Sequence, residues 1–254
     1  MKTKTNLLIC MLCVLGFASC TDWSAKYLEE AKKAIATVEN KYDYVKPVYD
    51  EFLNRSKTED VCIVRNSADE LSEMEAFSIA LGLPESQKKT EKPDDVLILH
   101  FGQFGIDCNN EIFEPEYKNI SFWDTEYVTM REYYLSTYYD YDSRKIDDRY
   151  SYEMKIEDLN RYFVEPLSKA KYLAVVEDLI LAKPKYGQGG FVGGGVTAMV
   201  YMYNLDTFEK MDSFFVAAIN SDKVQADDRN DLMIDLYRNL ANNLYYKLKA
   251  EAWK

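Results

Sequence analysis

Residues 196–219, VTAMVYMYNLDTFEKMDSFFVAAI, decide the fold class of this chain. Two parts of this stretch, Val196–Tyr203 and Met211–Ile219, alternate apolar with more polar residues, which is typical of strands that bury one face. A polar segment that includes Asn204 and Asp206 lies between them, and these residue types favour turns. The stretch therefore predicts two antiparallel strands joined by a short turn.

Outward from this hairpin, three more apolar runs predict buried strands, at Val61–Val64, Val96–Phe101 and Tyr172–Leu181. A long C-terminal helix is expected to open at Asp227 and Asp228. Leucines recur along it every four residues, on one face, at Leu232, Leu236, Leu240, Leu244 and Leu248.

Three more helices are expected, over residues 23–53, 68–81 and 156–163. Pro47 should kink or divide the first near Lys46, and Pro166 should end the third, because proline lacks the amide donor of a helix. The first helix has an apolar stripe, which we expect to dock on its own domain; a coiled coil is the alternative. The stripe consists of Ala31, Ile35, Val38, Tyr42, Val45, Tyr49 and Phe52.

This order of elements predicts an α+β fold. We expect a single mixed or antiparallel sheet of about five strands covered by helices, with an N-terminal helical segment and a long C-terminal helix. The globular domain is expected to cover residues 59–254, after a helical segment over residues 20–58.

The first twenty residues have the features of an export signal. Lys2 and Lys4 precede an uncharged apolar run, Leu7–Phe17, and two small residues then lead into Cys20. The run is shorter than the roughly 20 residues that a spanning helix needs. The segment resembles the signal peptide and lipobox of bacterial lipoproteins. That resemblance implies removal of residues 1–19, acylation of the Cys20 thiol with fatty acid such as palmitate, and a lipid-anchored protein of the cell envelope, in the outer membrane. An exported protein without lipid is the alternative.

A second resemblance concerns residues 170–250. The strand pair and the following helix are similar in order to the small domains of envelope lipoproteins in the curli-secretion and penicillin-binding-protein-activator group. This similarity concerns the fold and assigns no functional residue.

The charge of the chain restricts its partners. A formal net charge of −12 argues against nucleic acid, whose binding depends on neutralising phosphates with Lys and Arg. No cofactor motif is present. A metal site is not expected either, because one histidine, His100, and two cysteines beyond Cys20 cannot supply a usual zinc set.

The sequence is compatible with two states of Cys62 and Cys108, a disulfide between them or two free thiols. An oxidising compartment would permit a disulfide between them. Each also lies in or beside an apolar stretch, where a free cysteine behaves as a small hydrophobe.

The strongest candidate for a functional surface is a segment rich in tyrosine and aspartate. Aromatic anchors are enriched at protein interfaces, and aromatic faces with carboxylates also suit glycans, so an envelope protein and a glycan are alternative partners. Packing of the tyrosines in the core is the third alternative. The segment contains Tyr133, Tyr134, Tyr138, Tyr139, Asp140, Tyr141 and Asp142.

Three other features could indicate a catalytic or ligand-binding site, but a structural role is favoured for each. The glycine-rich segment 187–195 lacks the Gly-Lys-Ser/Thr of a phosphate loop and is predicted to be a flexible hairpin loop; its glycines are Gly187, Gly189, Gly190, Gly193, Gly194 and Gly195. His100 stands within a predicted strand and should be packed or hydrogen-bonded there. Three pairs of adjacent acids could in principle serve a carboxylate-dependent hydrolase, but adjacency does not produce the required separation; they are Asp94 with Asp95, Asp147 with Asp148 and Asp227 with Asp228. The sequence thus favours a non-catalytic protein-interaction module.

Overall fold

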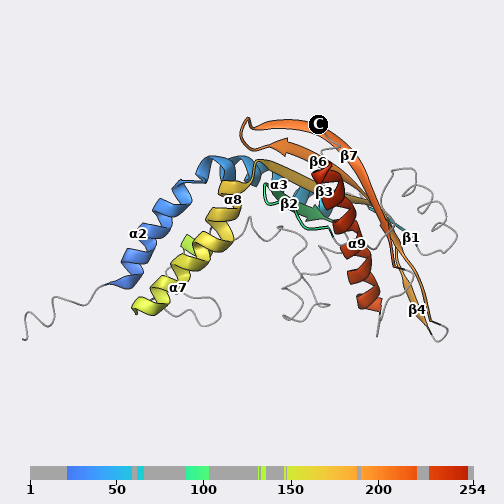
Figure 1. Ribbon diagram of the computed structural model, residues 1–254, viewed down its shortest axis with the longest axis horizontal. Coiled ribbons are helices and arrows are strands. Elements are labelled where there is room, and N and C mark those ends of the chain that lie inside the picture. Colours follow the sequence, from blue (N-terminus) through green and yellow to red (C-terminus); the bar gives the residue numbers. More distant parts are fainter. Residues whose placement is uncertain are drawn as a thin grey trace, which may run out of the picture.

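The computed structural model describes residues 22–58, 62–65, 90–102, 131, 133–135, 146, 148–187, 190–221 and 229–250. The helices are α2 (Trp23–Ala36), α3 (Glu39–Thr58), α7 (Arg149–Leu159), the π-helical turn η3 (Asn160–Val164), α8 (Glu165–Lys169) and α9 (Arg229–Lys249). The strands are β1 (Ile63–Arg65), β2 (Val96–Phe101), β3 (Tyr172–Ala182), β4 (Lys185–Gly187), β5 (Gly190–Val192), β6 (Gly195–Asn204) and β7 (Glu209–Ile219). Together they form an α+β fold, as predicted (Figure 1).

The main sheet is mixed and has five strands, with β3 at its centre. β6 runs antiparallel along one edge of β3, and β7 runs antiparallel to β6, which confirms the predicted hairpin. β2 and β1 are both parallel to β3 and follow each other along its opposite edge, β2 beside residues 172–177 and β1 beside residues 180–182. The register of β3 against β6 shifts between Asp178 and Ile180, so an irregularity in β3 lies where β2 ends and β1 begins.

The helix α9 covers one face of the sheet (Figure 1). All five leucines of its predicted stripe are buried, and the last four, from Leu236 to Leu248, pack with alternate residues of the strands such as Val176 and Val200. Burial of each leucine stabilises the fold by about 1.5–3 kcal/mol.

On the opposite side of the sheet, α3 and α8 contact β2. α2, α3, α7, η3 and α8 share a core with strand residues such as Leu99 and Val175. The predicted N-terminal stripe contributes to this core, since Ala31, Val45 and Phe52 are at most 1% exposed. The stripe is therefore docked on its own domain.

The N-terminal helical segment divides earlier than predicted. The break lies at Thr37 and Val38, between α2 and α3, while Pro47 lies inside α3 without ending it. Thr37 and Val38 are β-branched, which lowers helix propensity, and the Thr37 hydroxyl donates to the Ala34 carbonyl at 2.6 Å. This local bond competes with continuation of the helix.

The third predicted helix also differs from expectation, because it continues past Pro166 to Lys169. The backbone widens to a π turn just before the proline, where the backbone amide of Glu165 donates to the carbonyl of Asn160, five residues earlier. Proline removes one helical hydrogen bond, and a wider turn is a common accommodation.

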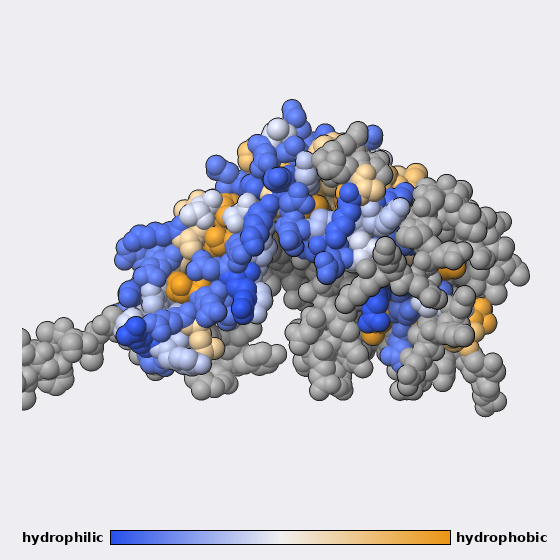
Figure 2. All heavy atoms as spheres, viewed as in Figure 1, coloured by the Kyte–Doolittle hydropathy of each residue, from blue (hydrophilic) through white to orange (hydrophobic). Residues whose placement is uncertain are grey.

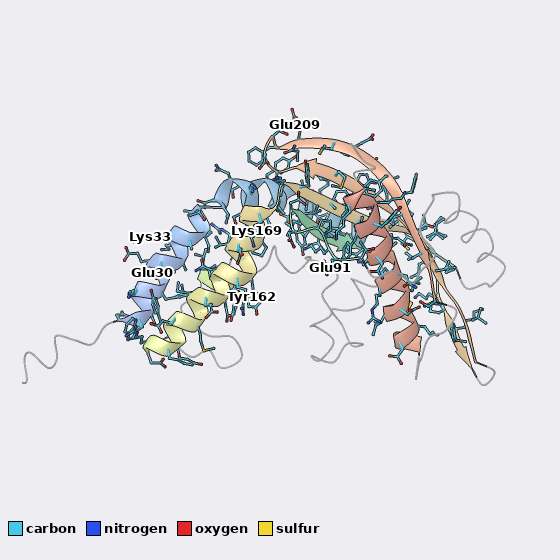
Figure 3. The ribbon with its side chains drawn as sticks, in the orientation of Figure 1. Glu30, Lys33, Glu91, Tyr162, Lys169 and Glu209 are labelled. Carbon is cyan, nitrogen blue, oxygen red and sulfur yellow. The ribbon has the colours of Figure 1, made fainter. Side chains whose placement is uncertain are left out.

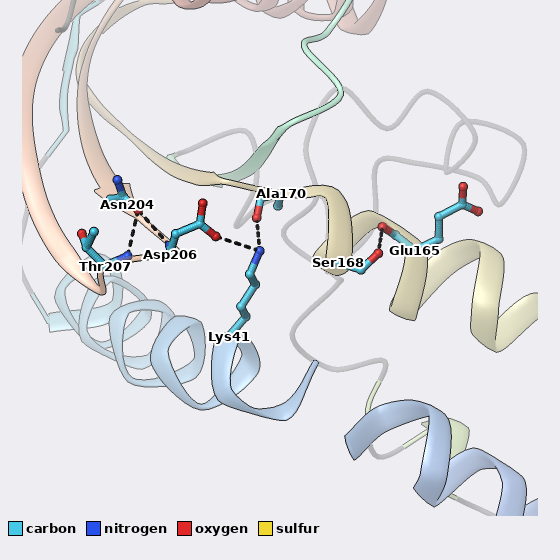
Figure 4. Close-up of polar contacts among 7 residues, drawn as sticks. All are labelled: Lys41, Glu165, Ser168, Ala170, Asn204, Asp206 and Thr207. Carbon is cyan, nitrogen blue, oxygen red and sulfur yellow. Dashed lines mark hydrogen bonds and ion pairs between the residues drawn. The ribbon is translucent and has the colours of Figure 1, made fainter. Parts of the chain in front are cut away.

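Lys41 ties the helices to the sheet. Its ammonium donates to the Ala170 carbonyl at 2.5 Å and lies 3.4 Å from a carboxylate oxygen of Asp206, in the turn between β6 and β7 (Figure 4). The same turn is closed by Asn204, whose side chain accepts from the amides of Asp206 and Thr207. One cation thus joins three parts of the chain that are distant in sequence.

Side chains of α9 cover part of the edge strand β7. Asn239, Asn243 and Lys247 donate to the carbonyls of Ile219, Ala217 and Phe215, at 2.9, 2.8 and 2.9 Å. We call these three bonds the edge ladder. An exposed strand edge invites pairing with another chain, and covering it with a helix is one protection against this.

α2 and α7 lie side by side and form an arm that projects from one end of the sheet (Figure 1). Both helices begin at the free end of the arm, where the Trp23 and Tyr152 rings lie 5.3 Å apart and the Ser24 hydroxyl donates to the Ile146 carbonyl. Figure 3 shows Glu30 and Lys33 on α2, on the outer side of this arm. No helix in the described ranges is both long and apolar enough to cross a membrane.

Candidate functional site

Two adjacent carboxylates at the middle of the sheet form the most polar part of the core. Glu177 and Asp178 occupy successive positions of β3, so their side chains point to opposite faces. They are only 3% and 1% exposed. A buried carboxylate is costly unless it is paired and hydrogen-bonded, so the partners of each decide its role.

Asp178 faces α9 and joins three elements. The Nε2 atom of His100, on β2, lies 3.0 Å from one carboxylate oxygen, and the hydroxyl of Tyr237, on α9, donates to the other at 2.5 Å. The backbone next to β2 leaves room for this carboxylate only because residue 102 is glycine: a Cβ there would lie 2.0 Å from Oδ2 of Asp178. His100 is thus a packed and hydrogen-bonded strand residue, as predicted.

Cys62 lies beside this group, just before β1, and is not an activated nucleophile. Burial, followed by the charge of Asp178, raises the pKa of its thiol from an ordinary 9.0 to about 12. The thiolate is the reactive form of cysteine, so a thiol that stays protonated at neutral pH is a poor nucleophile. Beside Asp178, Cys62 is therefore a protonated thiol at neutral pH.

Cys62 is a free thiol in the structure. Cys108 lies outside the described residues, as does Cys20, so both the disulfide and the lipidation remain predictions.

Glu177 faces the other layer of helices. Its carboxylate accepts from Arg55 of α3 at 3.1 Å and from the Tyr201 hydroxyl at 3.2 Å. The guanidinium of Arg55 also lies over the Phe52 ring, 5.1 Å from its centroid. This ion pair attaches the end of α3 to the centre of the sheet.

A third buried charge, Lys155, lies inside the arm. It is 1% exposed, and its ammonium lies 5.2 Å from the ring centroid of Tyr27 and 4.8 Å from that of Tyr133. Ammonium groups are attracted to the faces of aromatic rings. The cation therefore joins α2, α7 and the segment 133–135.

The predicted tyrosine surface is corrected by these contacts. Tyr134 is 4% exposed, its hydroxyl donates to the Asp158 carbonyl, and burial raises its pKa. Tyr133 is half-buried, and its ring packs against the ring of Tyr134. These two residues belong to the core of the arm, because the Tyr133 ring lies beside Lys155 and the Tyr134 ring packs against Tyr133 and Phe163. The other five members of the surface, Tyr138, Tyr139, Asp140, Tyr141 and Asp142, lie outside the described residues, so contact of this segment with a protein or a glycan stays a prediction.

The glycine-rich segment forms a small hairpin. β4 and β5 pair antiparallel, with Gly187 opposite Gly190, and Gly189 lies outside the described residues. A Cβ at Gly194 would lie 2.5 Å from the Ala182 carbonyl, and the Gly194 amide donates to the side chain of Asn220. The close approach of backbones accounts for the glycine there, and Gly193 and Gly195 flank it at the start of β6.

The acid pairs and metal ligands show no catalytic arrangement in the described part of the chain. Asp94 and Asp95 lie in the turn before β2, and Asp148 caps α7 by accepting from the Ser151 amide at 2.7 Å. Asp147, Asp227 and Asp228 lie outside the described residues. No group of three His, Cys, Asp or Glu side chains among the described residues could hold a metal ion.

Two exposed features remain, and the sequence did not single out either. The first, which we call the sheet patch, lies on the sheet face that α3 covers, beyond α3, and comprises Ile63, Ile180, Met199 and Phe215. Ile63 is opposite Ile180, and Met199 is opposite Phe215. Ile63 and Phe215 are 52% and 39% exposed, and the four residues belong to neither core.

The second feature is the free end of the arm, where Trp23 starts α2, Tyr150 lies in the first turn of α7 and Met154 follows one helical turn later. Tyr150 is 71% and Met154 40% exposed, and Trp23 is half-buried. We call these three residues the arm tip. Figure 2 shows apolar residues reaching the surface of the arm between hydrophilic ones. The sequence feature that could have indicated the arm tip is the position of Trp23, three residues after Cys20.

Comparison with known proteins gave no matching family model, no similar curated protein and no similar solved structure.

Proposed function

We propose that this chain is a lipid-anchored protein of the bacterial cell envelope, attached to the outer membrane through Cys20, and that its α+β domain is a non-catalytic module that binds another envelope protein. The anchoring rests on the order of Lys2, Lys4, the apolar run and Cys20. Two or more acyl chains hold a protein on a bilayer stably.

The partners of the buried charges support the non-catalytic part. Within the described residues, the charged side chains in the core are used to join elements: Asp178 with His100 and Tyr237, Glu177 with Arg55, and Lys155 with Tyr27. Groups of this kind act on a substrate only if they face a site that the substrate can enter. Here each lies between a strand or helix and its neighbour.

The sheet patch is the observation that carries protein binding. Single exposed apolar residues are ordinary on protein surfaces, but contiguous ones mark interaction sites. Ile63, Ile180, Met199 and Phe215 come from four neighbouring strands and lie on one face. An apolar surface of a protein partner is the occupant that fits this patch, because it buries all four side chains together.

The anchor is tested by metabolic labelling with a fatty-acid probe. The wild-type chain should carry the label on the mature protein, and Cys20→Ala should lose it and be released or misprocessed. Cys62→Ala is the matched control and should keep the label. Label that persists on Cys20→Ala would contradict the anchor.

Protein binding is tested with a photo-crosslinking amino acid placed at Ile63 in cells. Tyr246 is the matched control site, since it is 46% exposed on α9, which packs on the opposite face. We expect a discrete crosslinked protein from position 63 that is absent from position 246 and is lost when Phe215 is also changed to Ser. Equal crosslinking from both positions would contradict a binding site at the sheet patch.

A further inference from the structure

We propose that the arm tip is a membrane-contacting surface, which inserts Trp23, Tyr150 and Met154 into the headgroup layer of the bilayer that holds the Cys20 lipid. This inference rests on the proposed lipid anchor. It adds an orientation of the whole molecule and a second attachment point, neither of which follows from lipidation alone.

Only a short stretch of chain separates the anchor from the first helix. α2 begins at Trp23, and its first turn is fixed by the Asp22 carboxylate, which accepts from the Ala25 amide at 3.0 Å. Consecutive Cα atoms are 3.80 Å apart, so a fully extended chain places Asp22 at most about 7–8 Å from Cys20. Each headgroup layer is roughly 5–8 Å thick, as the difference between the whole bilayer and its hydrocarbon core shows. A lipidated Cys20 therefore holds the start of α2 at the membrane surface.

α7 begins at the same end of the arm as α2 (Figure 1). The Trp23 and Tyr152 rings lie 5.3 Å apart, and the Lys26 ammonium lies 5.1 Å from the centroid of the first and 4.8 Å from that of the second. Tyr150 and Met154 follow on α7, one helical turn apart. The fold, and not the local sequence alone, thus brings their exposed side chains to the anchored end.

The side chains of the arm tip have the chemistry that suits a membrane interface. Tryptophan and tyrosine combine an apolar ring with a polar group, and they are enriched where one end of a residue is apolar and the other is wet, as at membrane interfaces. Tyr150 exposes 71% of its surface, more than any other large apolar side chain among the described residues. Methionine adds a flexible apolar chain that adapts to an irregular surface.

The charge of the arm tip differs from that of the chain as a whole. The chain as a whole has a formal net charge of −12, which an anionic membrane surface repels. At the arm tip, Asp22 and Asp148 are used as helix caps, and Glu153 is paired with Arg149 at 2.7 Å, so three acids stand against the two bases Lys26 and Arg149. The described residues of the tip therefore have one excess negative charge, a small share of the −12 of the whole chain, so headgroup contact there meets little of the total repulsion.

The experiment uses the full chain, expressed with its signal, purified and reconstituted into vesicles of zwitterionic lipid that contain headgroup-proximal brominated lipid as a quencher. Trp123 and Trp253 are replaced by Phe, so that Trp23 is the only reporter, and far-UV circular dichroism checks the fold. We expect a blue-shifted emission of Trp23 and a loss of its intensity that grows with the fraction of brominated lipid. Changing Tyr150 and Met154 together to Ser should reduce this loss. A second reporter, Tyr246→Trp in a chain whose three natural tryptophans are Phe, should not be quenched.

The outcomes separate this inference from the anchor on which it rests. A chain that carries the fatty-acid label at Cys20 but shows no quenching of Trp23, or equal quenching of Trp23 and of the reporter at position 246, overturns the membrane-contacting tip and leaves the anchor intact. A chain without the label overturns both. Quenching of Trp23 that is unchanged by the Ser substitutions would show that α2 is brought near the bilayer by the lipid alone, and it would also overturn the role of Tyr150 and Met154.

Discussion

Asn243 of α9 donates its side-chain amide to the carbonyl of Ala217 in β7 at 2.8 Å. This bond is the middle one of the edge ladder, and its neighbours follow at intervals of four helix residues and two strand residues. Four helix residues rise about 6 Å and two strand residues about 6.8 Å, so the two spacings nearly match. A helix can therefore satisfy alternate carbonyls of a strand edge, provided that it runs antiparallel to the strand, as α9 does.

Asn243→Ala should destabilise the protein and expose the edge of β7. The Ala217 carbonyl would lose its partner in a buried position, which costs about 1–3 kcal/mol. Chemical denaturation measures the loss, and analytical ultracentrifugation should detect self-association through the opened edge. Asn40→Ala is the control, because Asn40 is exposed within α3. Both changes raise helix propensity by up to about 0.7 kcal/mol, so the control should be neutral or stabilising. Equal effects of the two changes would exclude a stabilising role for the ladder.

Leu240→Ala should lower the free energy of unfolding by about 2–5 kcal/mol, since it removes a fully buried side chain from the core between α9 and the sheet. Urea unfolding followed by circular dichroism measures this. Tyr246→Ala, on the exposed side of the same helix, should change the value by no more than about 0.5 kcal/mol. A loss below that figure for Leu240→Ala would mean that α9 is not held by its leucines.

Gly102→Ala should destabilise the protein through a direct clash, because the new Cβ would lie 2.0 Å from the Asp178 carboxylate. Asp178→Ala should also destabilise, since it leaves His100 and Tyr237 without this acceptor in the core. The double variant should lose less stability than the sum of the two single changes, because residue 102 has no carboxylate to clash with. Additive losses in a double-mutant cycle would show that the clash is relieved elsewhere.

Stability should decline in alkaline solution. Burial raises the pKa of Cys62 from 9.0 to about 12 and that of Tyr203 from 10.0 to about 12. The unfolded chain releases these protons at its ordinary pKa values while the folded chain retains them, so the free energy of unfolding falls as pH rises from about 9 to 12. Denaturation midpoints at pH 8 to 11 measure the decline, and Tyr203→Phe should make it shallower above pH 10. Tyr150→Phe, at an exposed position, is the control and should leave the decline unchanged.

Periodicity predicted the parts of the fold that bury one side of an element. The hairpin of β6 and β7, the leucines of α9 and the stripe of α2 and α3 were all predicted correctly, because alternate or fourfold spacing of apolar residues reports directly which side faces the core. The positions of the breaks were predicted less well. Pro47 was predicted to kink or divide a helix and Pro166 to end one, but neither ends its helix. Packing and a π turn accommodate them.

The partners of the polar core could not be predicted. Glu177 and Asp178 were visible as two acids inside an apolar strand, but their partners Arg55, His100 and Tyr237 come from three other elements. Which residues meet across a sheet depends on the order and register of its strands, and the parallel placement of β1 and β2 beside β3 has no local signal. For the same reason Tyr134 was assigned to a surface although it lies in the core.

The position of β2 beside β3 also determines the order in which the molecule can assemble. β2 ends at Phe101 and its partner begins at Tyr172, so β2 stays unpaired until the segment between them is in place. β3, β6 and β7 follow one another closely and pair antiparallel, and pairs that are near in sequence have a lower loop-closure cost. The C-terminal half should therefore act as the template on which the N-terminal half folds, and pulse-labelled hydrogen exchange during refolding should show amide protection in residues 195–219 before residues 96–101. Because a chain is synthesised from its N-terminus, β2 would emerge before the strand with which it pairs and would become structured after it.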